Sequence, residues 1–257
     1  MHYELRGENI EICAVLLHGT APAASVDPLA RACEGLCTWA VVDLPGYGAS
    51  EQLADRSPEA VVDAVAELVG QLPHDDVFLV GHSFGGYLAL ATALRAAERL
   101  RGIVLLGPSF GVEPAEHAGY QGLAEALRAG IDITDVALER MLAPAFAAAN
   151  PDACEIVRNF YRGAHQASVA DDIDTVLRAP KLGEELAAVT VPVRIVVGDR
   201  DLPTPPDEVS ENARVLKQAE LTVLPGVGHT LCIEALDDVS SIVREFISAH
   251  RATHRLS

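Results

Sequence analysis

The sequence predicts an α/β fold in which helices flank a mostly parallel central sheet. Six short apolar runs, rich in β-branched residues and bounded by turn residues, have the character of buried parallel strands: 12–17, 38–42, 77–80, 103–106, 193–197 and 221–224. Helical patterns follow several of these runs, at 58–72, 87–100, 207–218 and 237–250. Strands that alternate with helices indicate βαβ units, which place successive strands parallel to one another.

The predicted helix at 58–72 has a well-marked start. Ser57 can cap the free N–H groups, Pro58 suits the first helical position, and Glu59 favours the positive end of the helix dipole. The apolar face of this helix consists of Val61, Val62, Val65, Leu68 and Val69.

The alternation of strands and helices breaks between residues 111 and 181. Ala-rich helical segments with several breakers replace the strand pattern there. We therefore expect an α/β core, residues 1–110 and 182–257, and a helical insertion, residues 111–181, that lies over the sheet as a cap. A chain of 257 residues that is 49% hydrophobic can bury one large core.

Charge and cysteine content argue against several classes of function. The 19 Lys and Arg residues against 37 Asp and Glu give a formal charge of −18, so we expect no nucleic-acid and no membrane partner. The N-terminus is polar and no apolar run reaches the ~18 residues of a membrane span, which predicts a cytoplasmic protein. The five cysteines include no Cys-x-x-Cys pair, so we expect reduced thiols and neither a metal nor another cofactor.

A reactive serine follows the predicted strand at 77–80. In open α/β sheets the ligand crevice lies beyond the carboxyl ends of the strands, and this strand runs through Gly81-His82-Ser83-Phe84-Gly85 directly into a helix. A strained turn between strand and helix needs small residues on both sides of the serine, and Gly81 and Gly85 supply them. We therefore predict Ser83 as a nucleophile; the alternative is a glycine-rich helix start that only packs or cradles a phosphate.

A base and an acid are predicted at two further strand ends. His229 follows the strand at 221–224 and precedes the last helix, which makes it the expected base for the serine hydroxyl. Asp201 lies in the loop after 193–197 and is the expected acid that orients His229. Asp199 is nearer the strand and could instead cap the turn or pair with Arg200.

An acyl-transfer site also needs two N–H donors aimed at the developing oxyanion. The backbone N–H of Phe84 is the first candidate. The second is the N–H of Thr20, because the loop His18-Gly19-Thr20 follows the strand at 12–17. We expect the His18 side chain to tie down this loop rather than to react.

Together these residues resemble the α/β-hydrolase superfamily, and in particular its esterase-like members. The likeness covers nearly the whole chain outside the insertion, and its motifs are His18-Gly19, the segment 43–50 (Asp-Leu-Pro-Gly-Tyr-Gly-Ala-Ser), the turn around Ser83, Gly198-Asp199-Arg200-Asp201 and Gly228-His229. The resemblance implies the chain order serine, acid, histidine, with the acid at Asp201 and a non-catalytic loop at 43–50.

The resemblance also carries expectations for the less regular parts of the chain. The insertion is expected to roof the pocket, so the substrate-pocket candidates are its large side chains: Tyr120, Met141, Phe146, Phe160 and Tyr161. Only about ten residues precede the first apolar strand, fewer than the family's usual N-terminal hairpin requires. The sheet is therefore expected to lack a full edge strand.

The leading hypothesis is a serine hydrolase that cleaves a carboxylic ester, or a related small acyl substrate, through Ser83, His229, Asp201 and an acyl-enzyme. A thioesterase, a C–C bond hydrolase, a perhydrolase and an acyltransferase are alternatives on the same residues, and a ligand-binding receptor without turnover is a further one. Serine at position 83 argues against haloalkane dehalogenase and epoxide hydrolase chemistry, which needs a carboxylate nucleophile. Neither a P-loop nor a Gly-x-Gly-x-x-Gly turn follows any strand, so a nucleotide-binding module ranks last.

Overall fold

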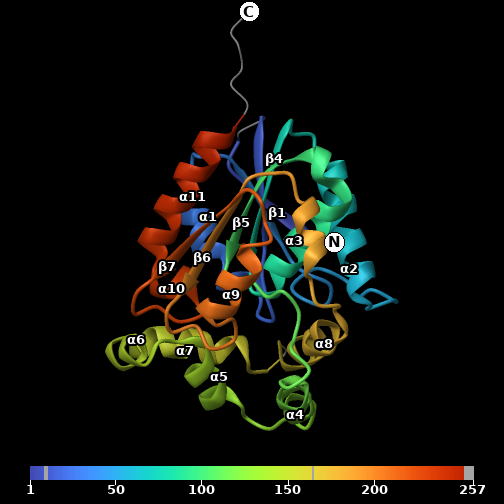
Figure 1. Ribbon diagram of the computed structural model, residues 1–257. Coiled ribbons are helices and arrows are strands. Elements are labelled where there is room, and N and C mark those ends of the chain that lie inside the picture. Colours follow the sequence, from blue (N-terminus) through green and yellow to red (C-terminus); the bar gives the residue numbers. More distant parts are fainter. Residues whose placement is uncertain (9–10, 164, 252–257) are drawn as a thin grey trace, which may run out of the picture.

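A seven-stranded sheet forms the centre of the molecule (Figure 1). The computed structural model describes residues 1–8, 11–163 and 165–251. The sheet order within these residues is β1-β3-β2-β4-β5-β6-β7, and every neighbouring pair is parallel except β1 and β3. The strands are β1 (Tyr3–Arg6), β2 (Ile12–Leu17), β3 (Thr38–Val42), β4 (Asp76–His82), β5 (Leu100–Leu106), β6 (Val193–Gly198) and β7 (Ala219–Leu224). The predicted α/β class with a mostly parallel sheet is confirmed.

The edge strand β1 is short. It is a strand of only four residues that pairs antiparallel with β3, with Tyr3 opposite Val42. The other strands lie where the apolar runs predict them, and β2 and β3 have the predicted bounds. Residues 3–6 therefore contribute a short edge strand, in agreement with the expectation that a full edge strand is lacking.

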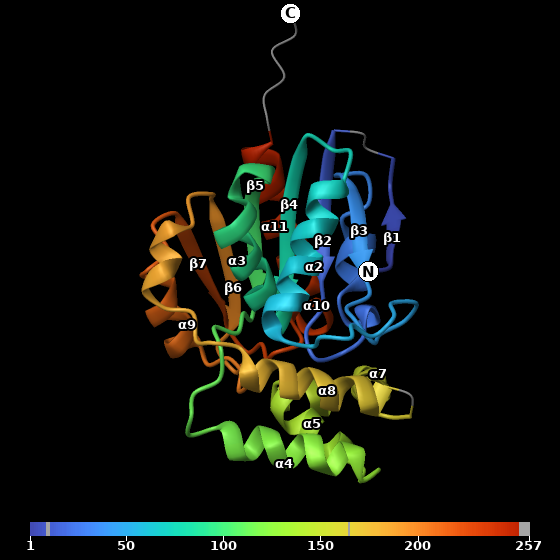
Figure 2. The same ribbon diagram turned by 90° about the vertical axis from the view of Figure 1, so that its right-hand side faces the viewer.

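Helices cover both faces of the sheet. On one face lie α2 (Pro58–Gln71), α3 (Phe84–Ala96) and α9 (Pro206–Ala213), and on the other lie α1 (Asp27–Ala32), α10 (Leu231–Glu234) and α11 (Leu236–His250) (Figures 1 and 2). Of these, α1 and α10 escaped prediction because both are short. The helix predicted from residue 87 instead begins at Phe84, immediately after Ser83, and its last predicted residue, Leu100, belongs to β5.

The start of α2 agrees with its predicted cap. The Ser57 hydroxyl oxygen accepts a hydrogen bond from the backbone N–H of Ala60 at 3.2 Å. The predicted apolar face is buried along its whole length, from Val61 to Val69. Burial of this face against the sheet anchors the helix, since each fully buried aliphatic side chain contributes roughly 1.5–3 kcal/mol.

Five helices form a separate layer at one end of the sheet (Figures 1 and 2). They are α4 (His117–Arg128), α5 (Thr134–Met141), α6 (Pro144–Ala149), α7 (Pro151–Phe160) and α8 (His165–Arg178), and all lie in the segment predicted as a helical insertion. The described part of 111–181 contains no strand. Position 257, the predicted end of the core, lies outside the described residues. In the part of the chain that is described, no helix has the length and apolarity needed to cross a membrane.

Candidate active site

Ser83 sits in a strained turn between β4 and α3. Its backbone has φ 55° and ψ −120°, and it is the one non-glycine residue with positive φ among those described. A Cβ atom at Gly81 would collide with the carbonyl oxygen of Gly85, and one at Gly85 would collide with that of Leu17. Backbone conformations of this kind cost about 1–3 kcal/mol and persist only where the surroundings enforce them. The packing of β2, β4 and α3 therefore holds Ser83 at the sheet edge.

Asp201 and His229 form a buried pair at the same edge. The Nδ1 atom of His229 lies 2.9 Å from Oδ2 and 3.0 Å from Oδ1 of Asp201, and both residues are 2% exposed. Thr204 donates its backbone N–H to Oδ1 at 2.8 Å and its hydroxyl to Oδ2 at 3.0 Å. This contact network gives the Asp201 carboxylate several donors in a site closed to water.

These contacts decide where the protons lie. Burial by itself raises the pKa of Asp201, but His229 and the two donors of Thr204 outweigh burial and hold that pKa below its usual value. An ionised carboxylate can only accept hydrogen bonds, so Nδ1 of His229 carries the hydrogen that faces it. In the neutral ring, Nε2 of His229 is then left with a free lone pair, as a general base requires.

Asp199, the other carboxylate of this loop, has a different partner. Its Oδ1 accepts the backbone N–H of Gly226 at 2.7 Å, and it lies 3.7 Å from Nε of Arg200. Asp199 thus stabilises the turn that precedes His229 and forms a loose ion pair with Arg200 at the surface. Both alternatives considered for Asp199 from the sequence are present, and of the two aspartates only Asp201 contacts the imidazole.

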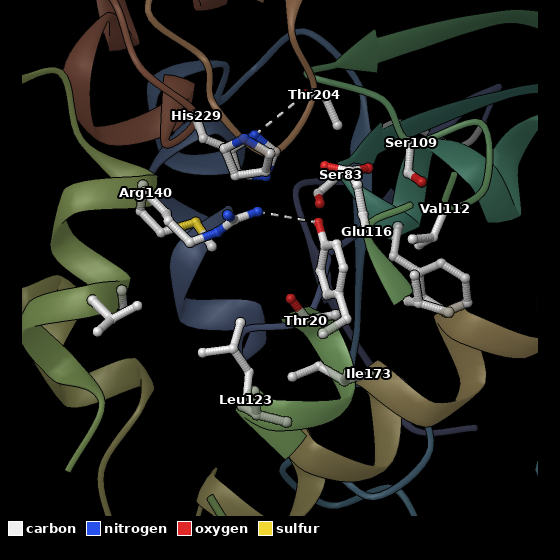
Figure 3. Close-up of a pocket in the computed structure, with 18 of the residues that line it drawn as sticks. Thr20, Ser83, Ser109, Val112, Glu116, Leu123, Arg140, Ile173, Thr204 and His229 are labelled. Atoms are coloured by element: carbon white, nitrogen blue, oxygen red, sulfur yellow. Dashed lines mark hydrogen bonds between the residues drawn. The ribbon is translucent and has the colours of Figure 1, made fainter. Parts of the chain in front are cut away.

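Ser83 and His229 line one cavity between the sheet edge and the helical layer (Figure 3). The cavity has a volume of about 850 Å³, part of it open to solvent. Thr20 and Phe84, the two predicted oxyanion donors, also line it. A serine and an imidazole therefore face one accessible space, and the imidazole is backed by the buried Asp201 carboxylate, an arrangement suited to nucleophilic catalysis.

Comparison with known proteins assigns the fold to a family. The sequence matches the family model described as "Alpha/beta hydrolase family" over residues 14–241. The chain belongs to the alpha/beta hydrolase family. It is 28% identical to a pimeloyl-[acyl-carrier protein] methyl ester esterase of Neisseria meningitidis, over 82% of this chain and 69% of the relative.

One further relative and one solved structure match this hydrolase over almost its whole length. A 2-hydroxy-6-oxononadienedioate/2-hydroxy-6-oxononatrienedioate hydrolase of Klebsiella pneumoniae is 26% identical, over 91% of this chain and 86% of the relative. The solved structure of a thermophilic esterase from Thermogutta terrifontis superposes with a TM-score of 0.88 at 24% identity, covering 98% of this chain and 94% of the esterase. The latter similarity establishes a shared fold.

The predicted pocket residues of the hydrolase fall into three groups. Tyr120, Met141 and Tyr161 line the cavity, as expected. Phe160 lines an adjoining hollow of about 390 Å³, which Ser83 and His229 also border. Phe146 borders neither space, because it lies on the short helix α6 and packs, partly buried, against the hydrophobic core. The prediction for Phe146 was based only on its size and its place in the insertion.

Thr204 and Arg140 are the two polar residues missed from the sequence that bear most on the site. Thr204 follows Asp201 by three residues, a spacing at which an aspartate commonly binds a backbone N–H, so the signal was present. Arg140 lies on α5 beside Met141, and with Ile133 and Ala137 it forms one helix face on the cavity. The spacing i, i+4, i+7, i+8 could have identified this face.

His18 holds the loop that carries Thr20. Nδ1 of His18 donates to the carbonyl oxygen of Gly19 at 2.8 Å, while Nε2 accepts the backbone N–H of Leu44 at 3.0 Å. Burial lowers the pKa of His18 to about 4, so the ring is neutral at physiological pH, as this pair of bonds requires. His18 therefore connects the ends of β2 and β3, in agreement with the expected structural role.

The backbone of His229 is held from two sides. The carbonyl oxygen of Met141, at the end of α5, accepts the N–H groups of His229 at 2.9 Å and Thr230 at 3.1 Å. Nε2 of His82 donates to the His229 carbonyl oxygen at 2.8 Å, and burial lowers the pKa of His82 to about 3, which keeps that ring neutral. The helical layer thus takes part in positioning His229.

The described part of the hydrolase contains no candidate metal centre. No group of three or more His, Cys, Asp or Glu side chains within it is arranged to hold a metal ion. All five cysteines are buried thiols, and burial raises the pKa of Cys13 and Cys232 to about 12 and that of Cys33 to about 11. Such thiols are poor ligands and poor nucleophiles near neutral pH.

Proposed function

We propose that this hydrolase cleaves a carboxylic ester, or a related small acyl substrate, with Ser83 as nucleophile, His229 as general base and Asp201 as orienting acid. The observation that carries the proposal is the buried Asp201–His229 pair on the cavity to which Ser83, in its strained turn, is also exposed. A nucleophile, a base and an orienting acid recur together on unrelated folds, because a serine hydroxyl needs an oriented base to attack a carbonyl carbon.

In the first step Ser83 Oγ attacks the substrate carbonyl carbon while its proton passes to Nε2 of His229. Asp201 stabilises the imidazolium that results and keeps the ring oriented. The tetrahedral oxyanion is bound by the N–H groups of Phe84 and Thr20. The position of Phe84 supports this role. It is the first residue of α3, where backbone N–H groups have no partner within the helix and the helix dipole has its positive end.

In the second step the tetrahedral intermediate collapses, and the leaving alcohol takes the proton from His229. The carbon–oxygen bond to the alcohol breaks, and the acyl group stays on Ser83 as an ester. A water molecule then attacks this ester while His229 takes one of its protons. Collapse of the second intermediate returns that proton to Ser83 Oγ and releases the acid.

The helices α4 to α8 act in this proposal as the cap, residues 111–181. Support comes from the cavity, whose wall combines residues of the sheet edge with apolar side chains of α4, α5 and α8. The hydrogen bond from the His229 N–H to the Met141 carbonyl oxygen, at the end of α5, further links the helical layer to the sheet. A cap of this kind limits the access of water and strengthens the electrostatic interactions inside the site.

Hydrolysis of a C–C bond is the second candidate function. The K. pneumoniae relative is named for a dienedioate substrate, which carries carboxylate, hydroxyl and ketone groups but no ester in its printed name. Hydrolysis splits a molecule with water, and in such a compound the bond that is split must be a carbon–carbon bond. Ser83, His229 and Asp201 could serve that reaction in the same positions, so an experiment has to separate the two.

A panel of substrates run in parallel on variants tests the proposal. Aryl esters, aryl thioesters and a β-diketone would be offered to wild type, to Ser83→Ala and, as a control, to Ser240→Ala. Ser240 lies on α11 away from the cavity, and its hydroxyl donates to the carbonyl oxygen of Asp237. We expect Ser83→Ala to lose at least about a thousandfold in kcat and Ser240→Ala to change little. Ester turnover that persists undiminished in Ser83→Ala would overturn the assignment. Turnover of the diketone alone would favour C–C hydrolysis, and ligand binding without turnover would favour a receptor.

A further inference from the structure

Arg140 is the one Lys or Arg side chain among the described residues that line the cavity. It lies on α5 and is half-buried. Most of the wall around it is apolar, built from side chains of α4, α5 and α8 such as Leu123, Ile133 and Ile173. A permanently charged group in such a wall needs a partner, because burial of an uncompensated charge is costly.

The protein itself supplies little to this guanidinium. Within the described residues no carboxylate lies at ion-pair distance from Arg140, whereas Arg158 on the adjacent helix α7 pairs with Asp135 and Glu155. Arg140 contacts only Tyr120 among the polar and aromatic groups described. It donates a long hydrogen bond of 3.5 Å to the Tyr120 hydroxyl, and its guanidinium carbon Cζ lies over the Tyr120 ring, 5.5 Å from the ring centre. Most of its five N–H donors are therefore free to bind a ligand.

The side chain is directed at the reacting groups. Figure 3 shows Arg140 reaching into the cavity that Ser83 and His229 also face. Its place is fixed relative to the site, because the next residue, Met141, accepts the backbone N–H of His229. A substrate held at Ser83 would thus have part of its structure beside a free guanidinium.

Two carboxylates on the cavity wall limit the charge of that substrate. Glu116 is exposed at the start of α4, and Glu208 is half-buried near Lys181. Burial raises the pKa of Glu208, with Lys181 acting in the opposite direction. A single guanidinium matches a single negative charge, and the two glutamates on the same wall disfavour a phosphate dianion. The planar fork of arginine also matches a carboxylate in a bidentate manner.

We propose that the substrate of this hydrolase carries a carboxylate in addition to its scissile acyl group, and that Arg140 binds this carboxylate. The proposal rests on the proposed function of Ser83 and names the substrate class for that site. It also identifies Arg140 as the residue that sets specificity. The overall charge of −18 repels anions, so an anionic substrate needs a local cation to enter the cavity.

Matched esters provide the test. Aryl monoesters of the dicarboxylic acids from succinate to suberate would be compared with aryl esters of monocarboxylic acids of equal chain length. Wild type, Arg140→Met and Arg140→Lys would be assayed, with Arg158→Met as a control on the neighbouring helix. At the best chain length we expect wild type to favour the acidic ester at least about tenfold in kcat/KM, the value of one charged hydrogen bond. Arg140→Met should lose this preference and keep its turnover of neutral esters, Arg140→Lys should keep part of it, and Arg158→Met should keep all of it.

The outcomes separate this proposal from that for Ser83. Ser83-dependent turnover without a preference for acidic esters, or with a preference that survives in Arg140→Met, overturns the role of Arg140 and leaves Ser83 in place. If no ester is turned over, calorimetric titration of glutarate and adipate decides: binding to wild type that is lost in Arg140→Met supports the site, and absence of binding to wild type overturns it. Melting curves and the neutral esters verify that Arg140→Met is folded.

Discussion

Gly107 packs directly against the carboxylate of Asp201. A Cβ atom at position 107 would lie 2.8 Å from Oδ2 of Asp201 and 3.3 Å from Nδ1 of His229. The backbone of Gly107 is left-handed, with φ +49°, and its N–H donates to the carbonyl oxygen of Val196 at 2.8 Å. The chain after β5 therefore forms one wall of the acid–histidine pair, and that wall has no room for a side chain.

Substitution of Gly107 by alanine should impair catalysis more than folding. The methyl group must displace Asp201 or His229, so we expect a loss of at least about tenfold in kcat/KM for an aryl ester, because small misplacements of reacting groups are costly. The left-handed backbone adds about 1–2 kcal/mol of destabilisation. Gly35→Ala is the matched control, since Gly35 has φ +80° but no atom within 4 Å of its added Cβ. Equal activities of the two variants would contradict the packing argument.

Asp201→Asn should lower kcat by about a thousandfold to ten-thousandfold, with little change in fold. The amide can donate to Nδ1 of His229 and thereby stabilise the wrong tautomer. Asp199→Asn provides the control, because Asp199 contacts the turn at Gly226 and not the imidazole. Steady-state kinetics on the same ester compares them, and a larger loss in Asp199→Asn would show that the acid has been misassigned.

Thr204 should contribute through its hydroxyl. Thr204→Val removes the 3.0 Å hydrogen bond to Oδ2 of Asp201 and leaves the backbone donor in place, so we expect about a tenfold loss in kcat, in keeping with one hydrogen bond to a charged group. Thr204→Ser keeps the hydroxyl and should retain most of the activity. The role of the hydroxyl would be refuted by a valine variant as active as the serine variant.

Asp172 should make stability depend on pH. This residue of α8 is 5% exposed, and burial raises its pKa to about 7, although Tyr47 and Arg56 act in the opposite direction. The folded state therefore keeps a proton that the unfolded chain releases near pH 4, so the stabilising effect of this proton is complete at low pH and is lost as pH rises through about 7.

Asp172→Asn cannot ionise and should avoid that loss. Its free energy of unfolding relative to wild type should rise between pH 4 and pH 8, by up to about 4 kcal/mol for a shift of this size. Urea titrations at a series of pH values measure the difference. Asp75→Asn serves as control for the loss of an exposed carboxylate. A difference for Asp172→Asn that rises no more with pH than that of the control would argue against a buried neutral carboxyl.

The parallel sheet was predictable because its strands are continuous apolar runs between turn residues. β2 and β3 have the predicted bounds for this reason. The edge strand β1 carries no such signature, since its residues are half-buried or exposed and its partner β3 lies far along the chain. The start of α3 was placed too late because Gly85 and Gly86 are poor helix formers, whereas tertiary packing requires them at that position.

The positions of the candidate catalytic residues were predictable to the extent that these residues follow strands. Ser83, Asp201 and His229 each come shortly after an apolar run, and parallel strands bring those ends together. Which residues of the helical layer reach the cavity depends on how its helices pack against the sheet. Local sequence does not determine that packing. Arg140 was therefore overlooked, and Phe146 was assigned to a cavity that it does not border.

Covalent labelling tests the central claim, that Ser83 is a nucleophile activated by His229. A fluorophosphonate would be incubated with wild type, Ser83→Ala and His229→Gln, and the modified peptide identified by mass spectrometry. The account predicts stoichiometric labelling of Ser83 in wild type, none in Ser83→Ala, and labelling slowed by about a thousandfold or more in His229→Gln. Rapid labelling of a different residue, or equal labelling of wild type and Ser83→Ala, would contradict it.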